Sequence, residues 1–208
     1  MQITRHDRLD QLFQIADQQQ GLFTTQQAVQ AGYQRKSHFF HERSGNWIRE
    51  HRGIYRLSRY PSSLESQYVL WHLWSRDIQG KPQGVLSHET ALSIYDLSDL
   101  NPSKIHVTVP KKFRRSANIP SILILHYRDL ETDHVNRSRG FQVTTPIRTV
   151  IDLILDQTTS WEFIIQAVQE GIQKGLILRK DLKAIEKIKE QTPQVQEMVN
   201  HVLKVVNR

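Results

Sequence analysis

The chain has 208 residues, of which 38% are hydrophobic, and it carries a formal net charge of +7 at pH 7. This length is sufficient for one or two globular cores, and the positive charge favours an anionic partner. The absence of cysteine excludes disulfides, thiolate metal sites and cysteine nucleophiles. There is no apolar run near the roughly twenty residues of a membrane span and no signal-peptide pattern, so we expect a cytoplasmic protein without a membrane partner.

The N-terminal segment is predicted to form a helix over about residues 5–19. Its apolar residues recur at the spacing of a helix with one buried face: Leu9, Leu12, Phe13 and Ala16. The pair Leu22-Phe23, which follows a glycine, is expected to form a short strand. The helix is therefore expected to be a packing platform for the elements that come next.

Two short helices joined by a glycine turn are predicted after this strand. Thr24 and Gln27 have the spacing of a capping box, which begins a helix of about two turns, and Gly32 ends it. A second helix over about residues 34–44 is expected to bury one or both of its phenylalanines, Phe39 and Phe40. Its polar side chains are expected to point mostly outward: Gln34, Arg35, Lys36, His38, His41 and Glu42. This spacing matches a helix-turn-helix whose second helix enters the major groove of DNA.

A basic hairpin is predicted directly after the second helix. Residues 47–50 and 54–57 both alternate in polarity, and Gly53 lies between them where a tight turn needs a positive φ. Between residues 33 and 59 there are seven lysines and arginines against two glutamates. A surface of this kind favours phosphate binding with counterion release. The order of the elements predicts a winged helix-turn-helix, and the charge predicts that it binds double-stranded DNA.

The residues expected to contact DNA fall into two groups. Arg35 and Lys36 can donate to guanine edges and Gln34 can pair with adenine, although contacts of these side chains with phosphates are the alternative. Arginines of the hairpin are expected to contact phosphates or the minor groove. The complete predicted set is Gln34, Arg35, Lys36, His38, His41, Arg43, Arg49, His51, Arg52 and Arg56.

A break in periodicity over residues 58–63 divides the chain into a DNA-binding domain, residues 1–60, and a second domain, residues 61–208. In the second domain, Ser87 and Thr159 are expected to cap helices. Strands are expected over residues 105–109, 122–127 and 141–144, and helices over residues 64–79, 146–155, 161–174, 179–190 and 193–206. The fold class is thus α/β of the α+β kind: an N-terminal winged helix-turn-helix, then a mixed α/β domain with a small sheet and a helical C-terminus.

The densest charge run of the chain follows the first of these strands. It contains Lys111, Lys112, Arg114 and Arg115. This run is either a second patch for nucleic acid or for a partner, or a solvated loop, since proline and small polar residues flank it.

Neither a catalytic site nor a metal or cofactor site is expected. His88-Glu89 lacks the second histidine of an H-E-x-x-H motif, because Leu92 stands in that position, and helix capping with packing against the sheet explains the pair. Arg148, Asp152 and Asp156 are interpreted as a salt-bridged helix face, since an arginine lies one turn before two like charges. The protein is therefore not expected to be an enzyme.

Several segments resemble AbiEi-type antitoxins of type IV, abortive-infection toxin-antitoxin systems. They are Gly21–Thr24, Ala31–Tyr33, Arg49–Arg56, Ser87–Leu92, Ile105–Pro110 and Thr145–Leu153, and the resemblance covers roughly residues 9–182. It implies a winged helix that binds promoter repeats and represses its own operon in phage defence. It also implies a C-terminal domain that counters a nucleotidyltransferase-like toxin without needing a stable complex with it.

Two alternatives remain open at the level of sequence. A nuclease would need acidic residues and a lysine clustered around a strand, and the acidic residues Glu65, Asp77, Glu89 and Asp99 do not form such a pattern. A transcriptional regulator whose second domain senses a ligand or forms an oligomer, with no toxin partner, is consistent with the sequence. A neighbouring nucleotidyltransferase gene would distinguish the antitoxin from this regulator.

Overall fold

The computed structural model describes residues 4–116 and 118–206. The chain forms two compact units, residues 1–84 with 137–142 and residues 85–136 with 143–208. This division differs from the predicted boundary after residue 60, because helix α4 (Leu64–Trp74) packs against the strands of the first unit. The segment after residue 60 thus continues the first unit.

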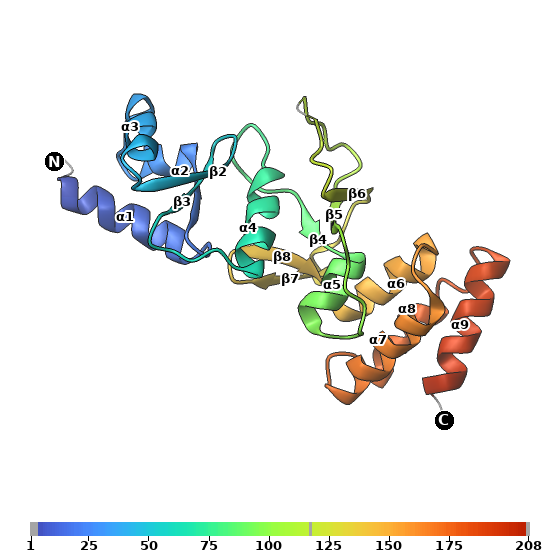
Figure 1. Ribbon diagram of the computed structural model, residues 1–208. Helices are drawn as coiled ribbons and strands as arrows, with labels where there is room; N and C mark the ends of the chain where they lie inside the picture. The colour runs from blue at the N-terminus through green and yellow to red at the C-terminus, as the bar shows by residue number, and fades with distance from the viewer. Residues whose placement is uncertain (1–3, 117, 207–208) are drawn as a thin grey trace. The chain divides into compact units, whose positions relative to one another are not determined.

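The first unit is a winged helix-turn-helix followed by one further helix (Figure 1). Its three strands form an antiparallel sheet in the order β1-β3-β2. The elements before α4 are α1 (Arg5–Asp17), β1 (Leu22–Thr24), α2 (Thr25–Gln30), the 3₁₀ turn η1 (Arg35–Ser37), α3 (His38–Arg43), β2 (Trp47–His51) and β3 (Ile54–Leu57). The predicted order of helix, turn, helix and hairpin is confirmed.

Local hydrogen bonds explain where these elements begin and turn. The predicted capping box of α2 is present. The backbone N–H of Gln27 donates to Thr24 Oγ1 at 3.2 Å, and the backbone N–H of Thr24 donates to Gln27 Oε1 at 2.8 Å. Gly53 has a φ of +71° in the β2–β3 turn, and a Cβ there would lie 2.9 Å from the Arg76 guanidinium. The positive φ therefore favours glycine at this turn, and a larger residue would also displace the end of the Arg76 side chain.

The core of the first unit is an aromatic cluster under the sheet. Phe23 and Trp47 meet edge to face with ring centroids 4.9 Å apart, and Leu12 and Ala16 of α1 pack against them, fully buried. The prediction that α1 buries Leu9 and Phe13 as well is wrong, since both are about half exposed. Only the narrower stripe that faces β1 is covered.

Helix α4 ends at Trp74, five residues before its predicted end. The hydroxyl of Ser75 donates to the His72 carbonyl at 2.6 Å and accepts from the Gly84 amide at 2.7 Å. The bond to Gly84 takes the place of the bonds of a further helical turn, because a serine hydroxyl can compete with helix formation by bonding to backbone groups. Ile78, which lies within the predicted helix, is consequently outside α4 and fully exposed.

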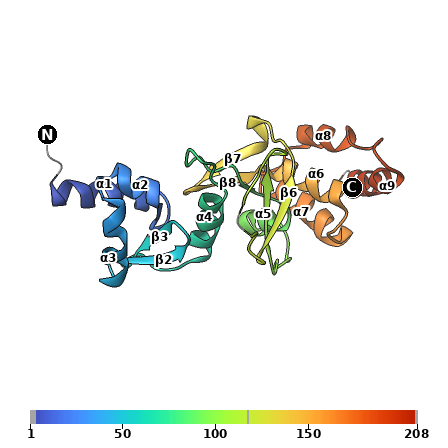
Figure 2. The same cartoon turned by 90° about the horizontal axis from the view of Figure 1, so that it is seen from above.

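The second unit contributes most of a five-stranded sheet, whose order is β6-β5-β4-β8-β7, and a group of C-terminal helices (Figures 1 and 2). Strand β4 pairs antiparallel with β5 and parallel with β8, while β5 and β6 are parallel. The strands are β4 (Val85–Leu86), β5 (Ile105–Val109), β6 (Leu123–Tyr127), β7 (Val135–Ser138) and β8 (Phe141–Thr144). Strand β7 was not predicted, because Val135 is its only strong strand former and most of it is exposed.

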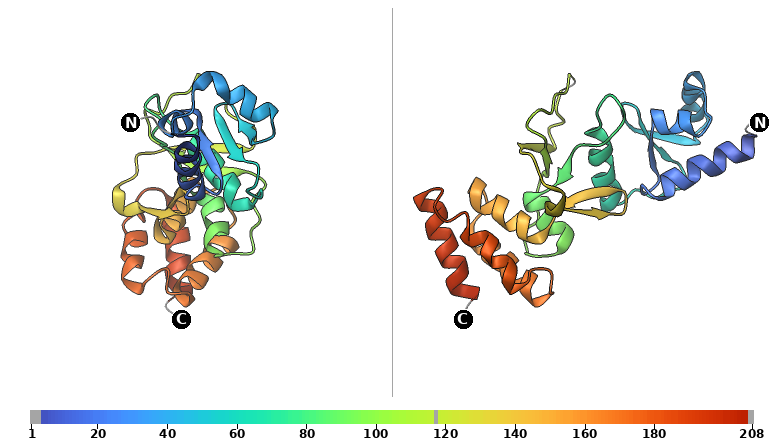
Figure 3. Two further views of the ribbon diagram at one scale, coloured as in Figure 1. Left: turned by 90° about the vertical axis from the view of Figure 1, so that its left-hand side faces the viewer. Right: turned by 180° about the vertical axis from the view of Figure 1, so that it is seen from behind.

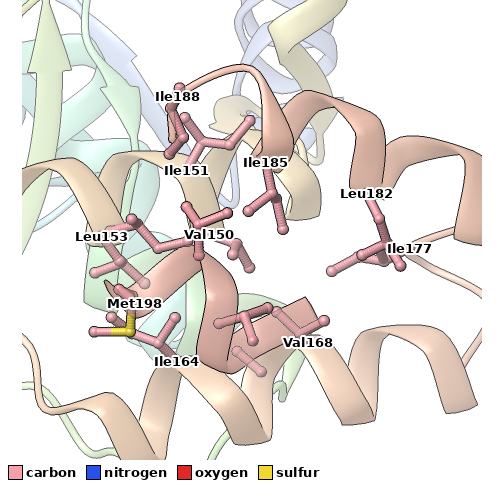
Figure 4. Packing of buried hydrophobic residues seen from close by; sticks show 14 of the residues in the cluster. Val150, Ile151, Leu153, Ile164, Val168, Ile177, Leu182, Ile185, Ile188 and Met198 are labelled. Carbon is pink, nitrogen blue, oxygen red and sulfur yellow. The ribbon is translucent and has the colours of Figure 1, made fainter. Parts of the chain in front are cut away.

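The helices that follow the sheet enclose the larger hydrophobic core (Figure 4). Helices α6, α7 and α9 lie side by side, as the two views of Figure 3 show. The helical elements are α5 (His88–Tyr95), the turns η2 (Thr132–His134) and η3 (Arg179–Asp181), α6 (Pro146–Asp156), α7 (Trp161–Gln173), α8 (Leu182–Glu186) and α9 (Pro193–Val206). In the described part of the chain, every helix is too short or too polar to cross a lipid bilayer.

Truncation of Leu153 tests the importance of this core. Leu153 is fully buried in α6, so Leu153→Ala is expected to lower the free energy of unfolding by about 2–5 kcal/mol through lost transfer energy and a cavity. Leu176→Ala, at a leucine that is 42% exposed in the same unit, serves as the control and should change stability much less. Urea denaturation followed by circular dichroism measures both, and equal losses would contradict the assigned core.

Candidate functional site

The second helix of the helix-turn-helix exposes both cations and aromatic rings. The side chains of Arg35, Lys36 and Arg43 are exposed, as is that of Gln34 just before the helix. The prediction that Phe39 or Phe40 is buried is wrong, since they are 62% and 67% exposed. This surface therefore combines positive charge with two apolar rings.

His38 takes the buried position that the phenylalanines were expected to hold. It is 4% exposed, and its ring lies 5.2 Å from that of Trp47, whereas the sequence predicted that it points outward. The reason is the 3₁₀ turn η1, which has about three residues per turn and shifts the phase of the helix that follows. His41 is half-buried and stacks on Trp47 at 4.5 Å.

The hairpin presents two of its arginines to solvent and holds the third inside. Arg49 and Arg52 are exposed. Arg56 is buried, pairs with Glu50 at 2.6 Å and donates to the Tyr60 carbonyl. Its charge is thus neutralised within the fold and is not presented to solvent.

The tip of the hairpin is fixed by two neighbouring segments. The guanidinium of Arg76 donates to the carbonyls of Arg52 and Gly53, at 3.3 and 3.4 Å. The Thr25 amide donates to the Gly53 carbonyl at 3.0 Å. Arg52 therefore projects from an anchored backbone, while His51 is half-buried beside Trp71 at a ring distance of 6.0 Å.

The basic run of the second unit lies in the long loop between β5 and β6, which extends away from these strands (Figure 3). Lys111, Lys112 and Arg114 are exposed and Arg115 is half-buried, while Phe113 between them is 5% exposed. The buried ring anchors the loop and leaves the cations outside. Whether they contact a partner stays a prediction.

A group of titratable residues that sequence reasoning did not bring together lies in the second unit. His88, His106 and His126 each offer a ring nitrogen, and these nitrogens lie within 4.8 Å of one another. Ser87 is the N-cap residue of α5, as predicted, but its hydroxyl makes no cap bond and accepts from Thr108 at 2.8 Å. The prediction for Thr159 is wrong, because the N-cap of α7 is Ser160 and Thr159 donates to Glu89 at 2.9 Å. Both side chains contribute to this cluster or its surroundings and make no hydrogen bond to a helix terminus.

Two aspartates of α6 stand beside these histidines. Asp152 is fully buried and pairs with Arg148 at 2.7 Å and with Arg128 at 2.5 Å, so part of the predicted salt-bridged face is present. Asp156 faces the histidines, and its hydrogen bonds from His126 and His88 hold the pKa of its carboxyl well below the usual range. Burial lowers the pKa of His106 to about 4.

The fold and the exposed cations place the first unit in the winged helix-turn-helix class, which many DNA-binding regulators share. Residues 10–58 match the family model described as "Transcriptional regulator, AbiEi antitoxin". The resemblance noted in the sequence is confirmed over these residues. The description of this family names transcriptional regulation and an antitoxin.

The whole chain also resembles a solved structure, described as the crystal structure of the RV2827C protein from Mycobacterium tuberculosis. The sequences are 11% identical, the TM-score is 0.62, and the alignment covers 95% of this chain and 76% of that one. This likeness shows a shared fold alone. Among curated proteins, none is similar enough in sequence to match the chain.

The burial of His38 predicts how this residue titrates. Burial, and then the charges of His41 and Arg35, lower the pKa of its ring from the usual value of 6.5. A histidine with a lowered folded pKa stabilises the fold above its unfolded pKa, and this contribution is lost as the pH falls through the folded pKa. NMR titration of the His38 ring should therefore give a midpoint below 6.5, and His38→Gln should flatten the decline in stability below that pH. A midpoint at or above 6.5 would contradict the burial of the ring.

Proposed function

We propose that this protein is an antitoxin and transcriptional autorepressor of a type IV, abortive-infection toxin-antitoxin operon that serves in phage defence. The observation that carries the proposal is the winged helix whose residues 10–58 match the AbiEi antitoxin family and whose recognition helix and wing expose cations. The first unit binds repeats in the operon promoter, and the second counters a nucleotidyltransferase-like toxin. Promoter binding implies that the protein acts in the cytoplasm.

In the proposed complex, α3 lies in the major groove and the hairpin lies along the backbone. Arg35 and Lys36 belong to the 3₁₀ turn η1 that leads into α3, where base edges come within reach of long side chains. Arg49 and Arg52 are set to neutralise phosphates. This arrangement keeps base reading and phosphate binding on separate elements.

Arg52 tests the phosphate contact of the wing. Arg52→Ala is expected to weaken binding to all DNA sequences and to reduce the slope of log K against log salt by about one. Lys180→Ala, at an exposed lysine of the second unit, is the control and should leave the slope unchanged. Fluorescence anisotropy at several salt concentrations provides the slopes, and an unchanged slope for Arg52→Ala would remove this residue from the interface.

Phe40 tests whether the exposed ring of α3 takes part in base recognition. An apolar side chain in the major groove contacts the methyl group of thymine, and such a contact releases no counterion. We therefore expect Phe40→Ala to weaken binding to the promoter several-fold, without a change in the salt slope or in binding to unrelated DNA. Leu178→Ala, at a leucine 48% exposed in the second unit, is the matched control. Equal effects on promoter and unrelated DNA would argue against base recognition by this ring.

Separate tests of the two proposed functions need variants of the full chain and not fragments, because a cut after residue 60 would remove α4 from the strands on which it packs. A double variant, Arg35→Ala with Arg52→Ala, removes exposed charge from the helix and the wing alone. When co-expressed with a nucleotidyltransferase-like toxin encoded beside it, this variant should still restore growth but should no longer repress a promoter reporter. If the unmodified chain fails to restore growth, the antitoxin assignment is wrong and a regulator without a toxin partner is left.

The basic loop of the second unit is examined in the same growth assay. Replacement of Lys111, Lys112, Arg114 and Arg115 by glutamate reverses its charge. Loss of protection with promoter affinity retained would assign the loop to the toxin or to the nucleic acid on which the toxin acts. If protection and promoter affinity are both retained, the loop is simply solvated.

A further inference from the structure

Three histidines from three different segments of the second unit lie together. His88 begins α5, His106 belongs to β5 and His126 to β6. His88 and His106 are 2% and 6% exposed, and the rings of His88 and His126 stack with centroids 3.5 Å apart. Three imidazoles seldom share a mostly buried site without a chemical reason, since histidine is the commonest metal ligand in proteins.

The topology of the sheet and one unusual backbone conformation bring these rings together. In the parallel β5–β6 ladder, Thr108 pairs with His126 and His106 pairs with Ile124, so both histidines lie on the same face. His88 has a φ of +52°, a left-handed conformation that is uncommon for residues other than glycine. Buried strain of this kind occurs preferentially at functional sites.

Asp156 holds two of the rings through a single oxygen. Its Oδ2 lies 3.0 Å from His88 Nε2 and 2.9 Å from His126 Nδ1. A carboxylate can only accept, so each of these nitrogens carries a hydrogen, and the lone pair of each neutral ring lies on its other nitrogen. For His88 this is Nδ1, which lies 2.8 Å from the Ser87 hydroxyl, and a metal ion there would take the place of that hydrogen bond. A carboxylate that accepts from the distal N–H is the usual partner of a metal-bound histidine.

Among the described residues, the hydrogen bonds of this cluster leave His106 facing a carboxylate to which it does not donate. With both rings neutral, His126 Nε2 accepts and His106 Nδ1, at 3.1 Å, donates to it. The lone pair on Nε2 of a neutral His106 then faces the Glu89 carboxylate, 3.6 Å away. Two acceptors facing each other repel, whereas a cation bound by His106 Nδ1 and His126 Nε2 would move the hydrogen of His106 to Nε2, where it faces Glu89.

We infer that His88, His106 and His126 together bind one divalent transition-metal ion of the zinc class, and that Asp156 positions two of the three ligands. Imidazole nitrogen suits zinc, copper, iron and nickel, and three histidines leave a fourth position for water or a further ligand. The 3.1 Å between His106 Nδ1 and His126 Nε2 is close to the roughly 3.3 Å that separates two nitrogens around a tetrahedral zinc with bonds of about 2.0 Å. The ion would join α5, β5 and β6, so it would stabilise the second unit. This site does not depend on the proposed DNA-binding or antitoxin function.

Cobalt is the probe for the experiment, because its visible absorption reports the ligands and the geometry. The full chain is treated with a chelator, freed of the chelator and titrated with Co²⁺, and Zn²⁺ is then added as a competitor. We expect one Co²⁺ per chain with visible bands of four-coordinate geometry, displacement by Zn²⁺, and a rise in the melting temperature with metal concentration. Absence of both the absorption and the melting shift in the unmodified chain would overturn the inference.

Variants assign the bound ion to its ligands. His106→Gln and His126→Gln should abolish the cobalt bands, and Asp156→Asn should weaken binding about 10–100-fold, because its role is to orient the rings. His134→Gln is the matched control, since His134 belongs to a second, more exposed group with Glu131 and Asp133. If His134→Gln loses the bands and the other variants keep them, the site is the exposed group and the inference is wrong.

A measurement on the unmodified chain keeps the test decisive if a variant fails to fold. In a sample with ¹⁵N-labelled histidine, Zn²⁺ should shift one ring nitrogen in each of His88, His106 and His126 and leave His72 unchanged. His72 is a suitable internal control, since it is buried in the first unit and bonded to the Gly84 carbonyl at 2.8 Å. Zinc-dependent shifts confined to other histidines would exclude the cluster as the site.

Discussion

The packing around Trp47 is the interaction on which the first unit depends. Its ring lies 4.9 Å from Phe23 of β1, 5.2 Å from His38 of α3 and 5.7 Å from Tyr55 of β3. One side chain thereby holds the sheet, the recognition helix and the wing in a single arrangement. Aromatic pairs contribute beyond their buried area, and a rigid core is what allows long cationic side chains to reach DNA from fixed positions.

The charged residues of the chain fall into two groups: those exposed to solvent and those already paired within the fold. Cations such as Arg49 and Arg52 are exposed and can neutralise phosphates, whereas Arg56 and Arg148 are already paired with Glu50 and Asp152. Counting positive charge along the sequence therefore overstates the surface that is free to bind. In the second unit the same principle applies to the buried carboxylate of Asp152 and the half-buried one of Asp156, which are compensated by arginine and histidine partners.

Local signals allowed a large part of the fold to be predicted. The capping box at Thr24 acts through hydrogen bonds within four residues and the turn at Gly53 through the conformation of one residue, and both elements appear in the structure. The candidate site was less predictable. The rotation that buries His38 and exposes Phe40 arises from a 3₁₀ turn, and the left-handed His88 is kept by packing between segments distant in sequence. No spacing rule connects His88 with His106 and His126.

The sequence by itself determined the class of protein, because helix caps, strand alternation and turn residues are local properties and their order defines a winged helix-turn-helix. Only the tertiary structure decided which charges are free and which residues meet. The pairing of Arg56 with Glu50 depends on strand register, and the meeting of three histidines and Asp156 depends on parallel strands and a helix that follows the sheet. Such contacts join residues far apart in the chain, so only the packing of the whole unit determines them.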